Sequence, residues 1–179
     1  GEGGGTARSS IVVFILETGD PMRQNILIIG ATSSIAEAVA LRYAKESAQF
    51  LLVARNKFKL DAVSANLTAH GARRVITFVM DANDSNLIPD MLDACWKTYE
   101  VIDVALIAHG TLPSQLRSET DMPYAIAEFR TNAESAITCM AGLAERFSPQ
   151  GKGVIAVIGS VAGDRGRASN YLYGSAKAA

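Results

Sequence analysis

The sequence is poor in metal-binding residues and has almost no net charge. It contains two cysteines, Cys95 and Cys139, and two histidines, His70 and His109, and their spacing matches no metal-ligand set. The cysteines fall in helical patterns, which favours reduced packing side chains in a cytoplasmic protein. The net charge of −1 and the lack of a Lys/Arg cluster give no electrostatic reason to expect a nucleic-acid partner.

Long apolar runs are also missing. No stretch approaches the roughly 20 apolar residues that a transmembrane helix needs, so we expect no membrane span. Apolar residues nevertheless make up 49% of the chain, enough for the core of one soluble domain. A glycine-rich start and the position of Met22 predict that residues 1–21 are a non-native or disordered leader and that the domain comprises residues 22–179.

Strand and helix patterns alternate from residue 25 onward. Apolar runs at residues 25–29, 50–54, 74–80, 102–108 and 153–159 are typical of parallel strands buried on both faces. Helical periodicity follows at residues 35–46, after the capping residue Asn56, at 87–99 and at 122–147. For the last helix we expect an inward stripe of Ile126, Phe129, Ala133, Ile137, Met140, Ala144 and Phe147. This alternation predicts an α/β fold with a doubly wound, Rossmann-like parallel sheet between two helical layers.

Small residues form the turn after the first predicted strand. The turn contains Gly30, Thr32, Ser33 and Ser34, and the helix begins near Ile35. In dinucleotide-binding folds such a turn lets the backbone approach a pyrophosphate, to which the helix N-terminus presents its N–H groups. An ordinary tight turn is the alternative, but its position after the first strand favours cofactor binding.

The ends of the second and third strands bear on the choice of cofactor. A carboxylate after the second strand would bind a ribose diol, whereas an arginine accommodates a 2′-phosphate. Arg55 stands there without an acid, which favours NADP(H) over NAD(H), although a solvated surface arginine is the alternative. Asp81, followed by Ala82, could accept a hydrogen bond from an adenine amino group or serve as a strand-end cap.

The end of the chain carries a candidate proton-transfer group. Ser160 ends the fifth apolar run, and Tyr173 and Lys177 follow as Tyr-x-x-x-Lys. On a helix these two side chains lie one turn apart on the same face. A phenol ordinarily loses its proton near pH 10, and an adjacent ammonium favours the phenolate. The pair alone also arises by chance on surface helices, so its meaning depends on the upstream motifs.

Together these motifs resemble the short-chain dehydrogenase/reductase family over residues 24–179. The family's Thr-Gly-x-x-x-Gly-x-Gly turn is matched by residues 29–36, with Gly30 kept and Ser34 and Ala36 replacing the other glycines. The family's Asn-Asn-Ala-Gly segment is matched by residues 107–110, where only Gly110 is kept. Ala108 and Gly110 are expected beside the cofactor, and His109 is expected to be a backbone spacer rather than a catalyst.

The resemblance implies an oxidoreductase that transfers a hydride between NADP(H) and a small-molecule carbonyl or secondary alcohol. Ser160 would bind the substrate oxygen, Tyr173 would pass the proton, and Lys177 would assist Tyr173 and hold the nicotinamide ribose. Asn132 would complete the relay through a water, unless its side chain only bonds back to the preceding helical turn. The family also implies a homodimer or homotetramer.

Two other hypotheses remain open: a non-catalytic NAD(P)-binding redox sensor, and an inactive fragment of the enzyme. The chain stops two residues after Lys177, so we expect the last strands of the sheet to be missing. Residues 160–178 are also similar to bacterial family members that reduce 2-keto-pentose polyprenyl phosphates. Arg165 and Arg167 could meet an anionic substrate there, with solvated loop arginines as the alternative.

Overall fold

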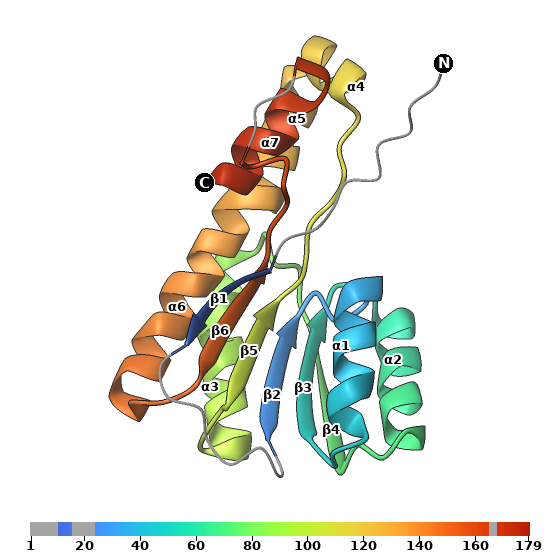
Figure 1. Cartoon of the computed structure of the whole chain (residues 1–179), viewed down its shortest axis with the longest axis vertical. Coiled ribbons are helices and arrows are strands. Elements are labelled where there is room, and N and C mark those ends of the chain that lie inside the picture. The colour runs from blue at the N-terminus through green and yellow to red at the C-terminus, as the bar shows by residue number, and fades with distance from the viewer. Residues whose placement is uncertain (1–10, 16–23, 165–167) are drawn as a thin grey trace.

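The computed structural model describes residues 11–15, 24–164 and 168–179 of the chain (Figure 1). The strands are β1 (Ile11–Ile15), β2 (Asn25–Ile29), β3 (Gln49–Ala54), β4 (Arg74–Val79), β5 (Val104–Ile107) and β6 (Val154–Ile158). The helices are α1 (Ser34–Ala44), α2 (Lys57–Ala69), α3 (Ile88–Tyr99), α4 (Gln115–Thr120), α5 (Met122–Phe129), α6 (Ser135–Gln150) and α7 (Tyr171–Ala178). Short 3-10 turns lie at η1 (Ser85–Leu87) and η3 (Ala168–Asn170), and a π-helical segment, η2 (Arg130–Glu134), joins α5 to α6.

The strands form one sheet in the order β1-β6-β5-β2-β3-β4. Strands β2 to β6 pair in parallel with one another, which confirms the predicted doubly wound sheet. Strand β1 pairs antiparallel with the outer edge of β6. The prediction of a non-native or disordered leader over residues 1–21 did not include this strand, which the edge of β6 holds by main-chain hydrogen bonds. The other residues of the expected leader, 1–10 and 16–21, lie outside the described part of the chain.

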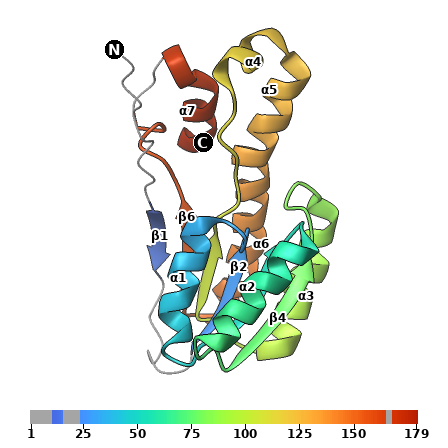
Figure 2. The ribbon, with the colours of Figure 1, turned by 90° about the vertical axis from the view of Figure 1, so that its right-hand side faces the viewer.

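Successive residues of the central strands enter two separate cores. Ile26, Ile28 and Leu52 pack with α1 and α2, whereas Leu27 and Leu51 pack with α3 and α6. Side chains alternate between the two faces of a strand, so a continuous apolar run is required where both faces are covered. Figures 1 and 2 show the resulting three layers, with α1 and α2 on one face of the sheet and α3 and α6 on the other.

The cap expected from the sequence, Asn56, is confirmed, and the structure shows a second cap at Ser33. The side chain of Ser33 accepts a hydrogen bond from the N–H of Ala36 and caps α1, and that of Asn56 accepts from Lys59 and caps α2. These caps fix where each helix begins relative to the strand before it. The turn between β2 and α1 is thereby held at the carboxyl edge of the sheet.

The inward stripe expected for the long helix is partly wrong. Ala133 and Phe147 are buried as predicted and Met140 is partly buried, but Ile126, Phe129, Ile137 and Ala144 are exposed. The buried positions after η2 are instead Ser135, Ala136, Cys139, Leu143 and Phe147. The prediction chose the larger apolar side chains along a regular helix, whereas the π-helical segment changes the register between α5 and α6.

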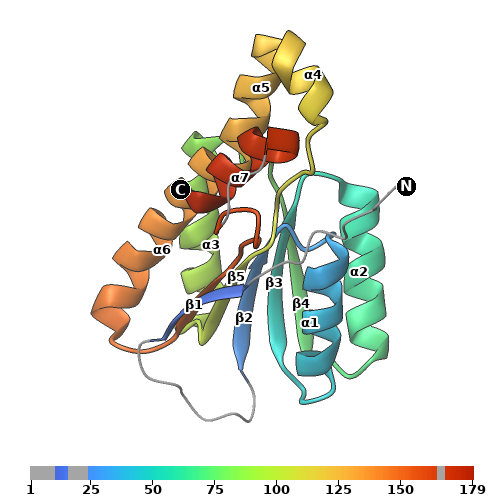
Figure 3. The ribbon, with the colours of Figure 1, turned by 45° about the horizontal axis from the view of Figure 1, so that its top comes forward.

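Helices α4, α5 and α7 lie beyond the carboxyl ends of the strands. Figure 3 shows α7 beside the junction of α5 and α6, where it contacts α4, α5 and η2. In the described part of the chain, no helix has both the length and the apolar character needed to cross a membrane.

Candidate functional site

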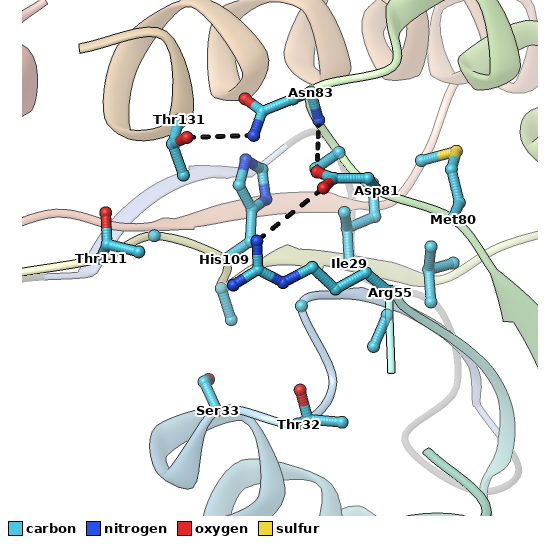
Figure 4. A pocket seen from close by; sticks show the side chains of 16 residues that line it. Ile29, Thr32, Ser33, Arg55, Met80, Asp81, Asn83, His109, Thr111 and Thr131 are labelled. Atoms are coloured by element: carbon cyan, nitrogen blue, oxygen red, sulfur yellow. Dashed lines mark hydrogen bonds and ion pairs between the residues drawn. The ribbon is translucent and has the colours of Figure 1, made fainter. Parts of the chain in front are cut away.

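A cavity of about 200 Å³ opens at the carboxyl ends of β2, β3, β4 and β5 (Figure 4). In open α/β sheets, ligands bind at this edge, beside the strand from which the chain winds in both directions. In this sheet that strand is β2. Of the residues proposed from the sequence to bind the cofactor, this cavity is lined by Gly30, Thr32, Ser33, Arg55, Asp81, Ala82, Ala108 and Gly110. Ser34 and Ile35 do not line it; they border a separate, open hollow on α1.

Gly30 brings the backbone of two strands into close approach. Its φ is +86°, and a Cβ built on it would lie 2.3 Å from the backbone nitrogen of His109. No side chain fits there, which explains why this first glycine of the turn is present. The N–H groups of Gly30 and Ala31 both donate to the carbonyl of Val53, so the turn is tied to β3.

Arg55 and Asp81 face each other across the cavity. A distance of 3.8 Å separates Arg55 Nη1 from Asp81 Oδ2, and both side chains are substantially exposed. An exposed pair at this distance contributes little to stability. The other oxygen, Asp81 Oδ1, accepts a hydrogen bond from the backbone N–H of Asn83 at 3.0 Å, so the carboxylate is held at the cavity rim.

Asn132 is buried inside the π-helical segment η2. Its Oδ1 accepts a hydrogen bond from the N–H of Thr111 at 3.0 Å, and its Nδ2 donates to Thr111 Oγ1 and to the carbonyl of Glu128, each at 3.0 Å. Thr111 Oγ1 in turn donates to the carboxylate of Glu128. The back-bond considered from the sequence is therefore present, together with a clamp that joins η2 to the loop after β5.

Lys177 and Asn132 converge on Gly110. A Cβ built on Gly110 would lie 2.9 Å from Asn132 Oδ1 and 3.3 Å from Lys177 Nζ, so a larger residue would displace one of them. Lys177 Nζ donates to the carbonyl of Ile158 at 3.3 Å, and burial lowers the pKa of Lys177. Both side chains border a second cavity of about 250 Å³ beneath α7.

Ser160 and Tyr173 lie on two neighbouring segments. Ser160 is buried, and its Oγ accepts a hydrogen bond from the N–H of Ala162 at 3.2 Å. Tyr173 is half-buried on α7, four residues before Lys177, and α7 packs on the Ser160 loop where Gly174 meets the carbonyl of Ala162. No direct hydrogen bond links Ser160 to Tyr173 among the described residues, so the structure places their segments together without joining the two hydroxyls.

The side chain of His109 does more than space the backbone. His109 Nε2 lies 2.8 Å from Ser135 Oγ, which itself donates to the carbonyl of Thr131. Asn83 Nδ2 donates to Thr131 Oγ1 at 3.0 Å, so a polar network runs from the loop after β4 to the end of β5. Burial, followed by the charge of Lys177, lowers the pKa of His109 to about 4, against an opposing effect of Asp81.

Sequence reasoning missed the residues that support this site: Asn83, Thr111, Glu128, Thr131 and Ser135. A signal for some of them was present, since residues 128, 131, 132 and 135 recur at helical spacing around Asn132. Arg165 and Arg167 lie outside the described residues. Within residues 11–15, 24–164 and 168–179, no group of three or more His, Cys, Asp and Glu side chains is placed to hold a metal ion.

Comparison with known proteins settles the family. A family model described as short chain dehydrogenase matches residues 24–179. The chain belongs to the short-chain dehydrogenase family. An uncharacterized oxidoreductase of Mycobacterium tuberculosis (strain H37Rv) is 36% identical to this short-chain dehydrogenase over 153 residues, covering 86% of this chain and 61% of that protein. Another, from Streptomyces coelicolor, is 33% identical over 160 residues, covering 87% and 61%.

Solved structures show the same fold. Levodione reductase superposes with a TM-score of 0.82 at 24% identity, covering 88% of this chain and 62% of that chain. An actinorhodin polyketide ketoreductase with NADPH and an NAD⁺-bound xylitol dehydrogenase superpose with TM-scores of 0.78 and 0.77, both at 20% identity and covering 87% of this chain and 60% of theirs. The chain spans about 61% of the length of each of the two curated relatives named above.

Proposed function

We propose that the protein is an oxidoreductase that transfers a hydride between a nicotinamide dinucleotide and a carbonyl or secondary alcohol. The observation that carries this proposal is the convergence of Asn132, Lys177 and Gly110 beside a cavity whose rim is the turn at Gly30. A phosphate-binding turn alone would serve a sensor, whereas the half-buried Lys177 and the buried Asn132 beyond it would serve proton transfer.

The cavity fits a dinucleotide. The turn of Gly30, Thr32 and Ser33 lines the cavity with small residues, and the capped start of α1 directs N–H groups toward a pyrophosphate there. Thr32, Ser33 and Gly30 would hold the phosphates, and Asp81 with Ala82 would hold the adenine. Ser34 and Ile35 would contribute through the backbone at the start of α1. The bound dinucleotide supplies the hydride.

The protein side chains supply the remaining chemistry. Ser160 holds the substrate oxygen with its buried hydroxyl, and Tyr173 gives that oxygen a proton in reduction or removes it in oxidation. Lys177, one helical turn from Tyr173, favours the ionised phenol and holds the nicotinamide ribose. Asn132 Oδ1 accepts one hydrogen bond from Thr111 and keeps a lone pair for a water beside Lys177.

We further propose a preference for NADP(H) over NAD(H). Arg55 follows β3, the strand next to β2, and no carboxylate stands beside it in the sequence. Its only close acid in the described chain is Asp81 on the next strand, at 3.8 Å. A 2′-phosphate would give the guanidinium a charge-assisted, two-point contact that is stronger than this pair.

A cytoplasmic homodimer or homotetramer completes the proposal. Ile126, Phe129 and Ile137 are exposed along α5 and α6, with 62%, 39% and 45% of their surface accessible. Apolar residues recurring on one helical surface fit a second copy of the chain better than they fit water.

The test is a titration followed by a turnover assay on the full-length protein. We expect NADPH to bind more tightly than NADH, and some ketone or keto-sugar in a broad panel to be reduced with loss of the absorbance of the reduced nicotinamide. Binding without turnover across the panel would favour the sensor. No binding of either nucleotide would reject the proposal.

A further inference from the structure

The hydrogen bonds around His109 determine which ring nitrogen carries the proton. The single hydroxyl proton of Ser135 is donated to the carbonyl of Thr131, at 2.9 Å. The hydroxyl can therefore only accept from His109 Nε2, 2.8 Å away, which makes Nε2 the protonated nitrogen. His109 Nδ1 is then a lone-pair acceptor. Its low pKa, about 4, keeps the ring neutral and the acceptor available near pH 7.

This acceptor has no partner within the described chain. His109 Nδ1 is buried without a hydrogen bond, and so is Asn83 Oδ1 on the same polar network. A buried polar atom without a partner is costly, and native proteins rarely keep one without a reason. His109 and Asn83 both line the nucleotide cavity beside Asp81. This wall of the cavity therefore contains several hydrogen-bond acceptors, which a hydrogen-bond donor on the ligand would satisfy.

We propose that His109 Nδ1 accepts a hydrogen bond from the exocyclic amino group of the dinucleotide's base and makes His109 a specificity-determining residue for adenine. An amino group has two protons, one for Asp81 and one for His109. A hypoxanthine base carries a carbonyl oxygen at that position. This oxygen is itself a hydrogen-bond acceptor, so it could not bond to Asp81 or to His109 Nδ1. The inference rests on the proposed function, because it requires that the cavity binds a dinucleotide.

Arg55, which is paired with Asp81 at this wall, is the side chain that an incoming base would move. Figure 4 shows the Arg55 side chain extending to Asp81 at the pocket that His109 also lines. The pair is exposed and its charged atoms are 3.8 Å apart, so opening it costs little. A 2′-phosphate that attracts Arg55 would clear the same wall for the base, which links recognition of the phosphate to recognition of adenine.

Two substitutions separate the acceptor from the bond to Ser135. In His109→Asn the side-chain amide stands near the place of Nδ1, so an acceptor is kept while the Ser135 bond is lost. In His109→Gln the amide reaches the place of Nε2, so the Ser135 bond is kept while the acceptor is lost. The control is His70→Gln, at an exposed histidine whose Nδ1 lies 2.8 Å from the carbonyl oxygen of Asn66.

The experiment measures the dissociation constants of NADPH and of reduced nicotinamide hypoxanthine dinucleotide phosphate by fluorescence titration of the full-length proteins. We expect the wild type and His70→Gln to bind the adenine form at least about fivefold more tightly, the worth of one good hydrogen bond. His109→Gln should show a clearly smaller preference, because only Asp81 still accepts from the amino group, and His109→Asn should keep most of it. Melting temperatures show whether each variant is folded.

The outcomes are distinct. A wild type that binds both nucleotides equally, or two His109 variants that change the preference alike, would overturn the role of Nδ1 while leaving nucleotide binding intact. If neither nucleotide binds to the folded wild type, the proposed function is rejected and the inference with it.

Discussion

Replacing Gly110 by alanine should disturb Asn132 and Lys177 together while leaving the sheet in place. The new Cβ would lie 2.9 Å from Asn132 Oδ1 and 3.3 Å from Lys177 Nζ, so at least one of the two must move by several tenths of an ångström. Gly110 also has a φ of +151°, which side-chain-bearing residues rarely adopt. Backbone strain of this kind costs about 1–3 kcal/mol, which for a chain of this size lowers the melting temperature by roughly 2–12 °C.

The expected loss of activity is larger than the loss of stability. A misplacement of about 1 Å in a reacting assembly can lower the rate by about 100-fold. We therefore expect steady-state turnover with NADPH to fall by about 10- to 100-fold in Gly110→Ala, measured at a temperature where circular dichroism shows that the variant is folded. NADPH binding should weaken less, because the turn at Gly30 is untouched.

Gly151→Ala is the matched control. Gly151 ends α6 with a φ of +72°, and a Cβ built there meets nothing within 4 Å. This variant takes on backbone strain without contact to a functional group, so we expect a lower melting temperature and unchanged turnover. Equal turnover in the two folded variants would refute the argument that Gly110 positions Asn132 and Lys177.

Three further predictions follow from charge and burial. Arg55→Ala should reduce the preference for NADPH over NADH by about tenfold, the low end for a charged hydrogen bond; titration with both nucleotides tests this, and an unchanged ratio would contradict it. Burial lowers the pKa of Lys177 in the folded protein below its value in the unfolded chain. At pH values below this folded-state pKa the lysine is charged in both states, and its charge destabilises the folded state. Lys177→Met should therefore raise the melting temperature near pH 7 while abolishing turnover, and a lower melting temperature would count against this account. The pKa of His109 falls from 6.5 to about 4, so its neutral ring contributes stability above pH 6.5 that is lost as the pH falls toward 4. Over that interval the wild type should lose up to about 3 kcal/mol more than His109→Gln in denaturant unfolding, and parallel curves would disprove the shift.

The sheet was predictable because burial on both faces leaves a direct mark on the sequence. Residues 25–29 are polar only at Asn25, and the observed strand has the same limits as the predicted one. Asn56 and Ser33 mark helix starts for an equally local reason, since each side chain satisfies an N–H of its own first turn. Such features depend on neighbouring residues and on the simple fact of burial.

The long helix shows where local reasoning fails. Ile137 fits a regular apolar stripe, yet it is exposed, and the smaller Ala136 is buried. The change of register comes from η2, where Asn132 bonds to Thr111 on a distant segment. Periodicity contains no information about such a contact. Strand β1 was missed for a related reason, because its partner β6 lies far along the chain.

Sequence reasoning named residues of the candidate site but did not foresee the hydrogen bonds between them. Eight of the sixteen residues that line the cavity are among those proposed from the sequence, while Ser34 and Ile35 border a separate hollow. The roles of Glu128 and Ser135 could not be foreseen, because they depend on hydrogen bonds between segments that only the fold brings together. His109 was taken as a spacer because nothing near it in the sequence reveals the partner of its ring.

The central claim is tested most directly by Tyr173→Phe in the full-length protein. With the carbonyl substrate found in the panel, the variant and the wild type are compared for NADPH affinity and for the rate of NADPH oxidation. The account predicts an unchanged dissociation constant and a loss of turnover of about 100-fold or more, as expected when a general acid is removed. Turnover that is indifferent to the Tyr173 hydroxyl would contradict the claim that this residue passes the proton.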